Sequence, residues 1–398
     1  DIIRADKVPF TGNGSVTMPM PDDIAVIIYT SGTTGSAKGI VLSHRNLTFN
    51  LKSYHKTYKC TTRDKWLSIL PMAHSYELTL GILYPFYCGA SVYYMSKPPV
   101  PALLLDSMKK IRPTVLLTVP LVIEKIYRNS VLPAIRNSKI LSWMNKHQHK
   151  LLCRIFGMKL RMTFGRRFGM GIGGARLDPT VEDFFYKARF NYAIGYGLSE
   201  TSSLICYALG KNRYPGSIGV PLPGVEMRLD NINPKTGEGE ILVRGDNVMP
   251  GYYKDPERTK AVFTEDGWFK TSDIAYMDKK GRYYLRGRLN NMIVCPSGKN
   301  IYPEEIESVI NDIEGVNESI VLERKGKLVA LIQLSDNIID WGCDGEADFY
   351  EKLEAIKAMV MDFVNEKVNK SSQINDVEVM KEPFERTATR KIRRFKYM

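Results

Sequence analysis

Short apolar runs rich in β-branched residues recur along the first two hundred residues of the chain and predict buried strands. They lie at residues 24–29 (IAVIIY), 115–119 (VLLTV), 170–172 and 191–196. Three of these runs lead into turns that contain glycine, and a helix is expected to begin near His44. The order of strand, glycine-rich loop and helix is typical of α/β proteins.

The pattern changes twice in the second half of the chain. Short alternating strands separated by glycine turns predict an antiparallel β-rich subdomain over about residues 215–288. An amphipathic helix (YPEEIESVINDI), two apolar strands (SIVLER and KLVALIQL) and a helical stretch over residues 347–368 follow. The sequence therefore predicts a large N-terminal α/β region, residues 1–288, that includes the β-rich subdomain, and a small α+β domain, residues 289–398.

One uncharged run of eighteen residues, 78–95 (LTLGILYPFYCGASVYYM), approaches the length of a membrane-spanning helix. Pro85 and Gly89 interrupt this run, and its last residues have the pattern of a buried strand. A core helix followed by a strand is therefore the preferred interpretation.

The composition is that of a soluble globular protein of two or three domains: 398 residues, 44% of them hydrophobic and 25% charged. The formal net charge of +13 favours acidic partners such as nucleotides, CoA, anionic lipid surfaces or nucleic acid. The basic stretch at residues 139–168 suits either a solvated helix face or peripheral contact with a membrane. The six cysteines form no CxxC pair and no metal-ligand spacing, which predicts reduced thiols and a cytoplasmic location.

The strongest local signal is the segment TSGTTGSAKG at residues 30–39, between a predicted strand and a predicted helix. Glycine lets the backbone fold tightly, so that amide N–H groups converge on phosphate oxygens. Hydroxyl side chains add donors and a lysine adds positive charge, although the pattern differs from the GxxxxGK[ST] loop. The residues expected to contact phosphate are Thr30, Ser31, Gly32, Thr33, Thr34, Gly35 and Lys38.

This loop resembles the signature of the acyl-adenylate-forming superfamily, which includes acyl-CoA synthetases, firefly-type luciferases and the adenylation domains of peptide synthetases. Ala37 stands where proline is usual. Further segments resemble motifs of that superfamily, in the expected order: LPMAHSYE, GIGGARLD, YGLSETSS, GWFKTSDIAYMDKKGRYYLRGR, SGKNIYPEEIE and ERTATRKIRRFKY. The segments TVPLVIEKIY and TATRKIRR are similar to the long-chain fatty acyl-CoA synthetase branch.

The resemblance implies a nucleotide site in which Glu200 holds Mg²⁺ and Lys391 promotes adenylation. The other nucleotide-binding residues that it implies are Gly173, Gly174 and Ala175 along the adenine, Tyr196 and Gly197 at its ring, Ser199 at the α-phosphate, Asp273 at the ribose and Arg288 near the phosphates. Taken singly, Glu200 and Asp273 also suit capping positions.

The same resemblance implies the acyl and thiol sides of the site. His74 would shape the acid pocket, although a histidine among apolar residues also suits a core position. Gly298 and Lys299 would face the thiol of CoA. Asn290 stands at the hinge position, where aspartate or lysine is common, and the small domain is expected to rotate about it. Members of the superfamily carry a substantial α/β region upstream of the phosphate loop, so the front of the large domain is expected to be missing here.

The implied chemistry has two steps. A carboxylate attacks the α-phosphate of ATP and pyrophosphate leaves, and the thiol of CoA then attacks the acyl-AMP. Because both reactants of the first step are anions, charge neutralisation by Lys38, Lys391 and a Mg²⁺ ion on Glu200 is expected to dominate. A long-chain fatty acid is the preferred substrate.

Other functions remain open at this point. One alternative is an adenylating enzyme that acts on an aryl acid or loads a carrier protein, and another is a non-catalytic nucleotide- or lipid-binding fragment. The presence of both Lys391 and Glu200 favours an enzyme. A nucleic-acid binder is suggested only by charge, and the sequence contains no recognisable module of that kind.

Overall fold

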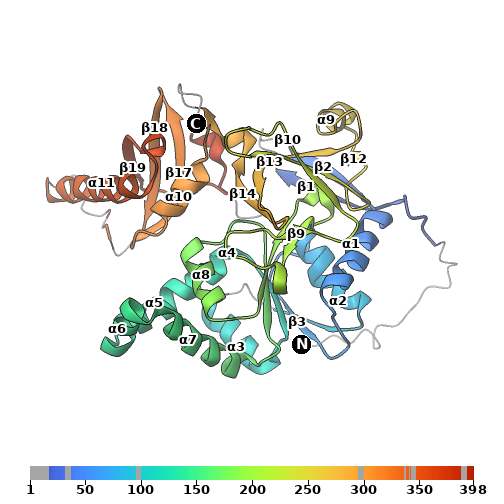
Figure 1. The fold of residues 1–398 in the computed structure, drawn as a ribbon, viewed down its shortest axis with the longest axis horizontal. Coiled ribbons are helices and arrows are strands. Elements are labelled where there is room, and N and C mark those ends of the chain that lie inside the picture. The colour runs from blue at the N-terminus through green and yellow to red at the C-terminus, as the bar shows by residue number, and fades with distance from the viewer. Residues whose placement is uncertain are drawn as a thin grey trace.

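The computed structural model describes residues 18–31, 37–95, 100–294, 300–335, 338–339, 341, 347–386 and 392–398. Its centre is a seven-stranded sheet in the order β4-β3-β5-β6-β7-β8-β9, of which the first five strands run parallel (Figure 1). This arrangement confirms the predicted α/β class. The strands are β3 (Lys65–Ser68), β4 (Ser91–Tyr94), β5 (Val115–Thr118), β6 (Gly169–Ile172), β7 (Tyr192–Tyr196), β8 (Cys206–Ala208) and β9 (Val220–Pro221).

Helices cover both faces of this sheet because alternate strand residues point in opposite directions. On β5, Leu116 belongs to one apolar core, whereas Val115 and Leu117 belong to a second core. Figure 1 places α1 and α2 on one side and α3, α7 and α8 on the other. The helices are α1 (His44–Thr57), the π-helix η2 (Glu77–Leu83), α2 (Tyr84–Tyr87), α3 (Pro101–Ile111), α4 (Pro120–Ile126), the π-helix η3 (Tyr127–Val131), α5 (Leu132–Arg136), α6 (Lys139–His147), α7 (His149–Phe164) and α8 (Pro179–Lys187).

The segment after the phosphate loop is a strand, so the expected direct passage from loop to helix is wrong. β1 (Ile24–Ser31) and β2 (Ala37–Ser43) form an antiparallel hairpin that places the loop at its tip. The residues AKGIVLS include an apolar, β-branched run that suits a strand. Helix α1 does begin at His44 as predicted, because the side chain of Ser43 caps it by accepting the backbone N–H of Asn46 at 3.2 Å.

The β-rich part contains a four-stranded antiparallel sheet in the order β10-β11-β13-β14, as the glycine turns predict. Its strands are β10 (Glu226–Asp230), β11 (Gly239–Arg244), β13 (Phe269–Met277) and β14 (Tyr283–Arg288). Two further elements lie between β11 and β13. Strand β12 (Gly251–Tyr252) pairs with β2 of the hairpin, and α9 (Pro256–Ala261) follows it.

The C-terminal residues form a small α+β domain with its own core. Strands β17 (Val316–Arg324) and β18 (Lys327–Leu334) pair antiparallel, and β19 (Asp376–Met380) pairs parallel to β18. Ile310, Val321 and Val360 are among the buried residues that join this sheet to its two helices. The remaining elements are β15 (Ile293–Val294), β16 (Asn300–Ile301), α10 (Pro303–Ile310) and α11 (Ala347–Lys367).

The uncharged run at residues 78–95 forms parts of η2 and α2 and then β4, which confirms a core helix followed by a strand. Leu80 and Tyr84 within it are buried. In the part of the chain that the structure describes, none of the helices has the length and apolar character needed to cross a bilayer.

A carboxyl group is buried at the start of η2. Glu77 has an exposed fraction of 1%; the hydroxyl of Ser68 donates to its Oε1, and its Oε2 has no hydrogen-bond partner among the described residues. A Cβ at Gly81 would lie 2.5 Å from the carboxyl carbon, so the glycine makes room for this group. Burial raises the pKa of Glu77 to about 7, which means that the folded chain binds a proton here near neutral pH.

The buried carboxyl group predicts a specific dependence of stability on pH. Because the pKa of Glu77 is raised on folding, its contribution to the free energy of unfolding is lost as the pH rises through about 7. Raising the pH from 6 to 8 should lower the free energy of unfolding by ~1 kcal/mol more in the wild-type chain than in Glu77→Gln. Urea unfolding at the two pH values measures this difference. Equal pH dependence of the two proteins would contradict the burial of a protonated Glu77.

Candidate active site

Three polar side chains from separate segments meet beside the phosphate loop. Lys38 lies on β2, Glu200 lies in the 3₁₀ turn η4 (Ser199–Thr201) after β7, and Tyr252 lies on β12. The Nζ of Lys38 is 2.5 Å from Oε1 of Glu200 and 3.0 Å from the hydroxyl oxygen of Tyr252. That hydroxyl donates to the same Oε1 at 3.1 Å. Because Glu200 is buried, its carboxylate needs such partners.

A second cluster joins the main sheet to the β-rich part. The hydroxyl of Tyr196, at the end of β7, donates to Oδ2 of Asp273 on β13 at 2.8 Å. Nε of Arg288, opposite Asp273 on β14, lies 3.2 Å from Oδ1. Burial raises the pKa of Tyr196 well above its usual value, and the nearby Asp273 carboxylate raises the pKa of Arg288. The phenol and the guanidinium therefore hold one buried carboxylate from two sides.

The glycines expected along the adenine lie just beyond the carboxyl ends of β6 and β7. A Cβ at Gly197 would lie 2.0 Å from the carbonyl oxygen of Ser203, and a Cβ at Gly173 would lie 3.3 Å from the carbonyl oxygen of Gly195. Gly174 has a φ of +87°, in the region that favours glycine. Gly173 and Gly197 are therefore positions at which the backbone packs closely against neighbouring backbone, and Ala175 follows Gly174 in sequence.

The segment that carries His74 reaches the same end of the sheet. The hydroxyl oxygens of Ser75 and Ser199 lie 3.2 Å apart, which joins this segment to η4. Nδ1 of His74 accepts the backbone N–H of Tyr76 at 3.2 Å. The ring of Tyr76 lies against Gly173, because a Cβ there would come within 3.3 Å of it. The segment that carries His74 therefore lies next to the turn that contains Gly173 and Gly174.

Sequence analysis missed three residues of this site. Tyr252 is 214 residues away from Lys38 along the chain, and no local pattern connects the two. Ser75 and Tyr76 directly follow His74, so the motif around the histidine was the available signal.

The structure describes the phosphate loop at its two ends, up to residue 31 and again from residue 37. Oγ1 of Thr30 is buried and has no hydrogen-bond partner in the described part of the chain. Ser31 pairs with Ala37 in the hairpin ladder, so the two strands meet where the loop begins. The site residues predicted from sequence that lie outside the described residues are Gly32, Thr33, Thr34, Gly35, Gly298, Lys299 and Lys391, together with the side chain of Ser31.

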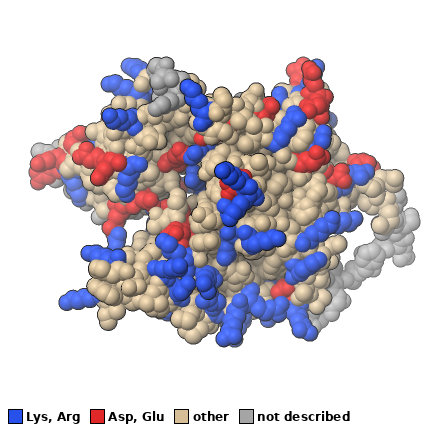
Figure 2. Space-filling view, viewed as in Figure 1, with Lys and Arg blue, Asp and Glu red and all other residues tan. Residues whose placement is uncertain are grey.

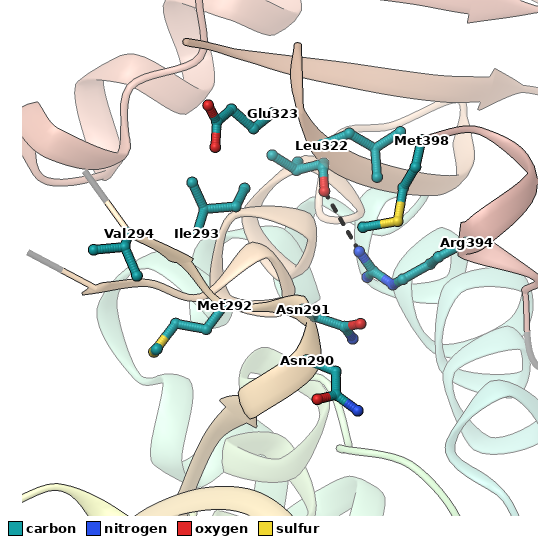
Figure 3. A pocket seen from close by; sticks show the side chains of 10 residues that line it. Asn290, Asn291, Met292, Ile293, Val294, Leu322, Glu323, Arg394 and Met398 are labelled. Carbon is teal, nitrogen blue, oxygen red and sulfur yellow. Dashed lines mark hydrogen bonds between the residues drawn. The ribbon is translucent and has the colours of Figure 1, made fainter. Parts of the chain in front are cut away.

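Asn290 lies in η6 (Leu289–Asn291), a single turn between β14 and β15. It lines a cavity of about 270 Å³ that β17 and the C-terminal tail also border (Figure 3). Arg394 donates to the carbonyl oxygen of Val321 at 3.4 Å and forms an ion pair with Glu307 of α10. The tail is therefore tied to the small domain beside the expected hinge.

Charged side chains connect the small domain to the helices of the large region. Arg136 of α5 forms an ion pair of 2.5 Å with Glu314. Arg128 of η3 lies 3.4 Å from a carboxylate oxygen of Asp178 and 3.9 Å from one of Asp312. Burial and the neighbouring Asp178 raise the pKa of Asp312 to about 7, with Arg128 acting in the opposite direction.

We expect this interdomain contact to weaken as the pH rises. A raised pKa means that the docked arrangement binds a proton on Asp312, so docking is favoured below pH 7 and is lost as the pH rises through about 7. Hydrogen exchange of the segment at residues 307–316, corrected for the intrinsic rate, should be faster at pH 8 than at pH 6.

Substitution separates Asp312 from its neighbours. Asp312→Asn keeps a neutral group beside Asp178, so the pH dependence of exchange should disappear in this variant. Glu314→Gln is the matched control, because it removes an exposed ion pair with Arg136 and should leave the pH dependence in place. An unchanged pH dependence in Asp312→Asn would rule out this carboxyl group as its source.

Comparison with known proteins identifies the family of this chain. The AMP-binding enzyme family matches residues 4–253. The peroxisomal long chain acyl-CoA synthetase 6 of Arabidopsis thaliana is 32% identical over 351 residues, which cover 81% of this chain and 49% of that protein. The chloroplastic long-chain-fatty-acid–[acyl-carrier-protein] ligase AEE15 of the same plant is 29% identical, with 94% of this chain and 60% of that protein covered. The chain thus spans about half the length of the first of these relatives.

Solved structures show the same fold. ATP-bound MatB from Rhodopseudomonas palustris is 26% identical and has a TM-score of 0.74, with 95% of this chain and 68% of that chain covered. The apo form of MatB gives a lower TM-score of 0.63 over 96% of this chain and 69% of that chain, at 25% identity. The described arrangement is therefore closer to the ATP-bound form. Since the family model matches more than half of this chain, the chain belongs to the AMP-binding enzymes.

Proposed function

We propose that this chain activates a carboxylic acid with ATP through an acyl-AMP intermediate and then transfers the acyl group to CoA. We further propose that the acid is a long-chain fatty acid. The observation that supports the proposal most is the meeting of the Lys38–Glu200 and Asp273–Arg288 pairs around the carboxyl ends of β6 and β7. Ligands of open α/β sheets bind at this end of the strands.

The nucleotide would lie across the two clusters. Its adenine would rest on the glycine turn beside Tyr196, and its ribose hydroxyls would donate to Asp273, which already accepts from Tyr196. Arg288 would stand near the phosphates, since it lies beside Asp273 on the neighbouring strand. A nucleotide held in this way needs few side-chain rearrangements, because the buried carboxylate is positioned before binding.

The residues present also fit a Mg²⁺ ion held by Glu200. Mg²⁺ usually binds one or two protein carboxylates together with phosphate oxygens and waters. Within the described residues, no group of three or more histidine, cysteine, aspartate or glutamate side chains could hold a metal ion by itself, which suits an ion shared with the nucleotide. When bound, the ion would supply positive charge to the phosphates.

Lys38 would then leave the carboxylate of Glu200 and contact the phosphates of the nucleotide. In the absence of nucleotide, its ammonium group neutralises Glu200. With a cation on Glu200, the ammonium group of Lys38 would be available to the phosphates at the loop beside it. A carboxylate oxygen of the acid attacks the α-phosphorus, the bond to the pyrophosphate oxygen breaks, and pyrophosphate leaves with the electron pair. The CoA sulfur later attacks the carbonyl carbon of the acyl-AMP. The bond from that carbon to the phosphate oxygen breaks, AMP leaves with the electron pair, and the thiol proton passes to solvent.

A carrier protein is the second candidate for the acyl acceptor. One relative, AEE15, is a ligase for an acyl-carrier protein and matches 94% of this chain. Its acceptor carries a thiol as CoA does, so the first half-reaction would be unchanged. An aryl acid remains the alternative substrate, and a panel of acids decides between the two classes.

Pyrophosphate release tests the first half-reaction. We expect release from ATP and Mg²⁺ that depends on long-chain acids rather than on aryl or short acids. Lys391→Ala and Glu200→Gln should each lower the rate by ~10²-fold or more, because Lys391 would supply positive charge to the transition state and Glu200 would hold the Mg²⁺ ion that does the same. Lys396→Ala is the matched control, since this lysine of the same tail forms an exposed ion pair with Glu385 and should leave the rate within a factor of two or so.

AMP titration makes a negative result informative. Binding of AMP without pyrophosphate release from any acid would refute the enzyme proposal for this chain and favour a nucleotide-binding fragment. Release that depends equally on all acids would refute the long-chain assignment alone. Thioester formation with CoA, compared with formation on an acyl-carrier protein, identifies the acceptor.

A further inference from the structure

The positive charge of the protein is concentrated in one continuous stretch. Residues 125–177 contain twelve lysines and arginines and no aspartate or glutamate. Since the formal net charge of the whole chain is +13, the other 345 residues together carry only +1. Figure 2 shows lysine and arginine side chains gathered over the lower part of the molecule, the part that holds α5 to α8 in Figure 1.

Helix α7 is fixed to the domain along one side only. Leu152, Cys153 and Gly157 are buried, and a Cβ at Gly157 would lie 2.1 Å from the carbonyl oxygen of Ala188, just after α8. Helix α6, which precedes α7, has no buried residue of its own. The outer sides of both helices therefore face away from the core.

Those outer sides carry large apolar residues at helical spacing. On α7 the exposed apolar residues follow one another at intervals of four, three and four, which places them on a single stripe. Ile140 and Trp143 of α6, three residues apart, are 73% and 56% exposed, and Met162 at the end of the α7 stripe is 76% exposed. The members of the α7 stripe are Leu151, Ile155, Met158 and Met162. We call this set of six residues the apolar stripe.

Basic residues flank the apolar stripe on both helices. Lys139 and Lys146 lie beside it on α6, and Lys150 and Lys159 lie on opposite sides of it on α7. All four of these lysines are exposed. An amphipathic helix with apolar residues on one face and lysine or arginine at its margins lies in the headgroup region of anionic membranes. Tryptophan favours the same depth, because its ring is apolar and its N–H is polar.

We propose that the outer face of α6 and α7 is a docking surface for an anionic lipid bilayer. The apolar stripe enters the headgroup region, and the flanking lysines contact lipid phosphates or carboxylates. A second copy of this chain would bring the same positive charge against the face, which disfavours self-association. A nucleic acid would satisfy the lysines but would leave the apolar stripe without a partner. The inference is independent of the proposed acyl-CoA chemistry, since it rests on a different part of the fold.

Vesicle sedimentation tests the proposal directly. The chain should sediment with vesicles of phosphatidylcholine and phosphatidylglycerol mixed 7:3, and much less with phosphatidylcholine alone. Met158→Ser/Met162→Ser leaves the charge unchanged and should weaken binding at least tenfold, and Lys146→Glu/Lys150→Glu should weaken it by a similar factor. Met277→Ser is the matched control, because Met277 is an exposed methionine on β13, and it should bind like the wild type.

Tryptophan fluorescence gives a second readout. Of the four tryptophans, Trp66 and Trp268 are buried, Trp341 is partly buried on the small domain, and Trp143 is exposed within the stripe. Anionic vesicles should therefore shift the emission to shorter wavelength in the wild type, and Trp143→Phe should remove that shift while retaining sedimentation.

Three outcomes would overturn the proposal. One is vesicle binding that is unaffected by Met158→Ser/Met162→Ser in a variant whose circular dichroism and melting temperature match the wild type. Another is the absence of vesicle binding together with tight binding to a single-stranded RNA oligonucleotide, which would assign the face to nucleic acid. The third is self-association in analytical ultracentrifugation that the stripe variant abolishes, which would assign it to a second copy.

Discussion

The ion pair between Lys38 and Glu200 is the contact on which the arrangement of the site depends. It joins the hairpin that carries the phosphate loop to the turn after β7. Tyr252 on β12, the strand that pairs with β2, also donates a hydrogen bond to the carboxylate of Glu200. A buried carboxylate without donors would be strongly unfavourable, so these three segments cannot separate without a replacement charge. The pair therefore holds the start of β2 against the turn after β7, and the proposed nucleotide and metal ion would each replace one of its two charges.

Asp273 provides the second fixed point, and it acts in the same way. Tyr196 and Arg288 each supply a donor, from the main sheet and from the β-rich part respectively. Since one carboxylate is shared between two sheets, its position is set by the fold and not by the ligand. The residues that join the two sheets are thus the same ones to which we assign the ribose in the proposed function.

The sequence predicts much of this architecture because the relevant signals are local. The α/β class, the core helix and strand at residues 78–95, and the start of α1 near His44 follow from periodicity and from chain-breaking residues, and the structure adds that Ser43 caps α1. The order of motifs further implies that His74, Tyr196 and Asp273 belong to one site, and the structure brings them to the same end of the sheet.

What the sequence does not predict depends on contacts between distant residues. The strand β2 was missed because a helix was expected directly after the loop, although the residues of β2 themselves suit a strand. Tyr252 reaches the site because β12 leaves the β-rich part and pairs with β2. Nothing in the sequence around Glu77 indicates that this carboxyl group is buried. Its burial is evident only from the close approach of Ser68 and Gly81 in the structure. For Tyr252 and Glu77 a tertiary contact, and not a local preference, decides where the side chain lies.

The way the small domain is attached indicates how it can move. Each part has its own apolar core, with Ile310 and Val360 in the small domain and Leu116 in the large one. The contacts between them that we describe are charged, such as Arg136 with Glu314 and Arg128 with Asp312. Exposed or partly exposed ion pairs contribute little to stability and are readily hydrated. Rotation of the small domain would therefore exchange such contacts for water while leaving both cores intact, which is compatible with the hinge that we propose at Asn290.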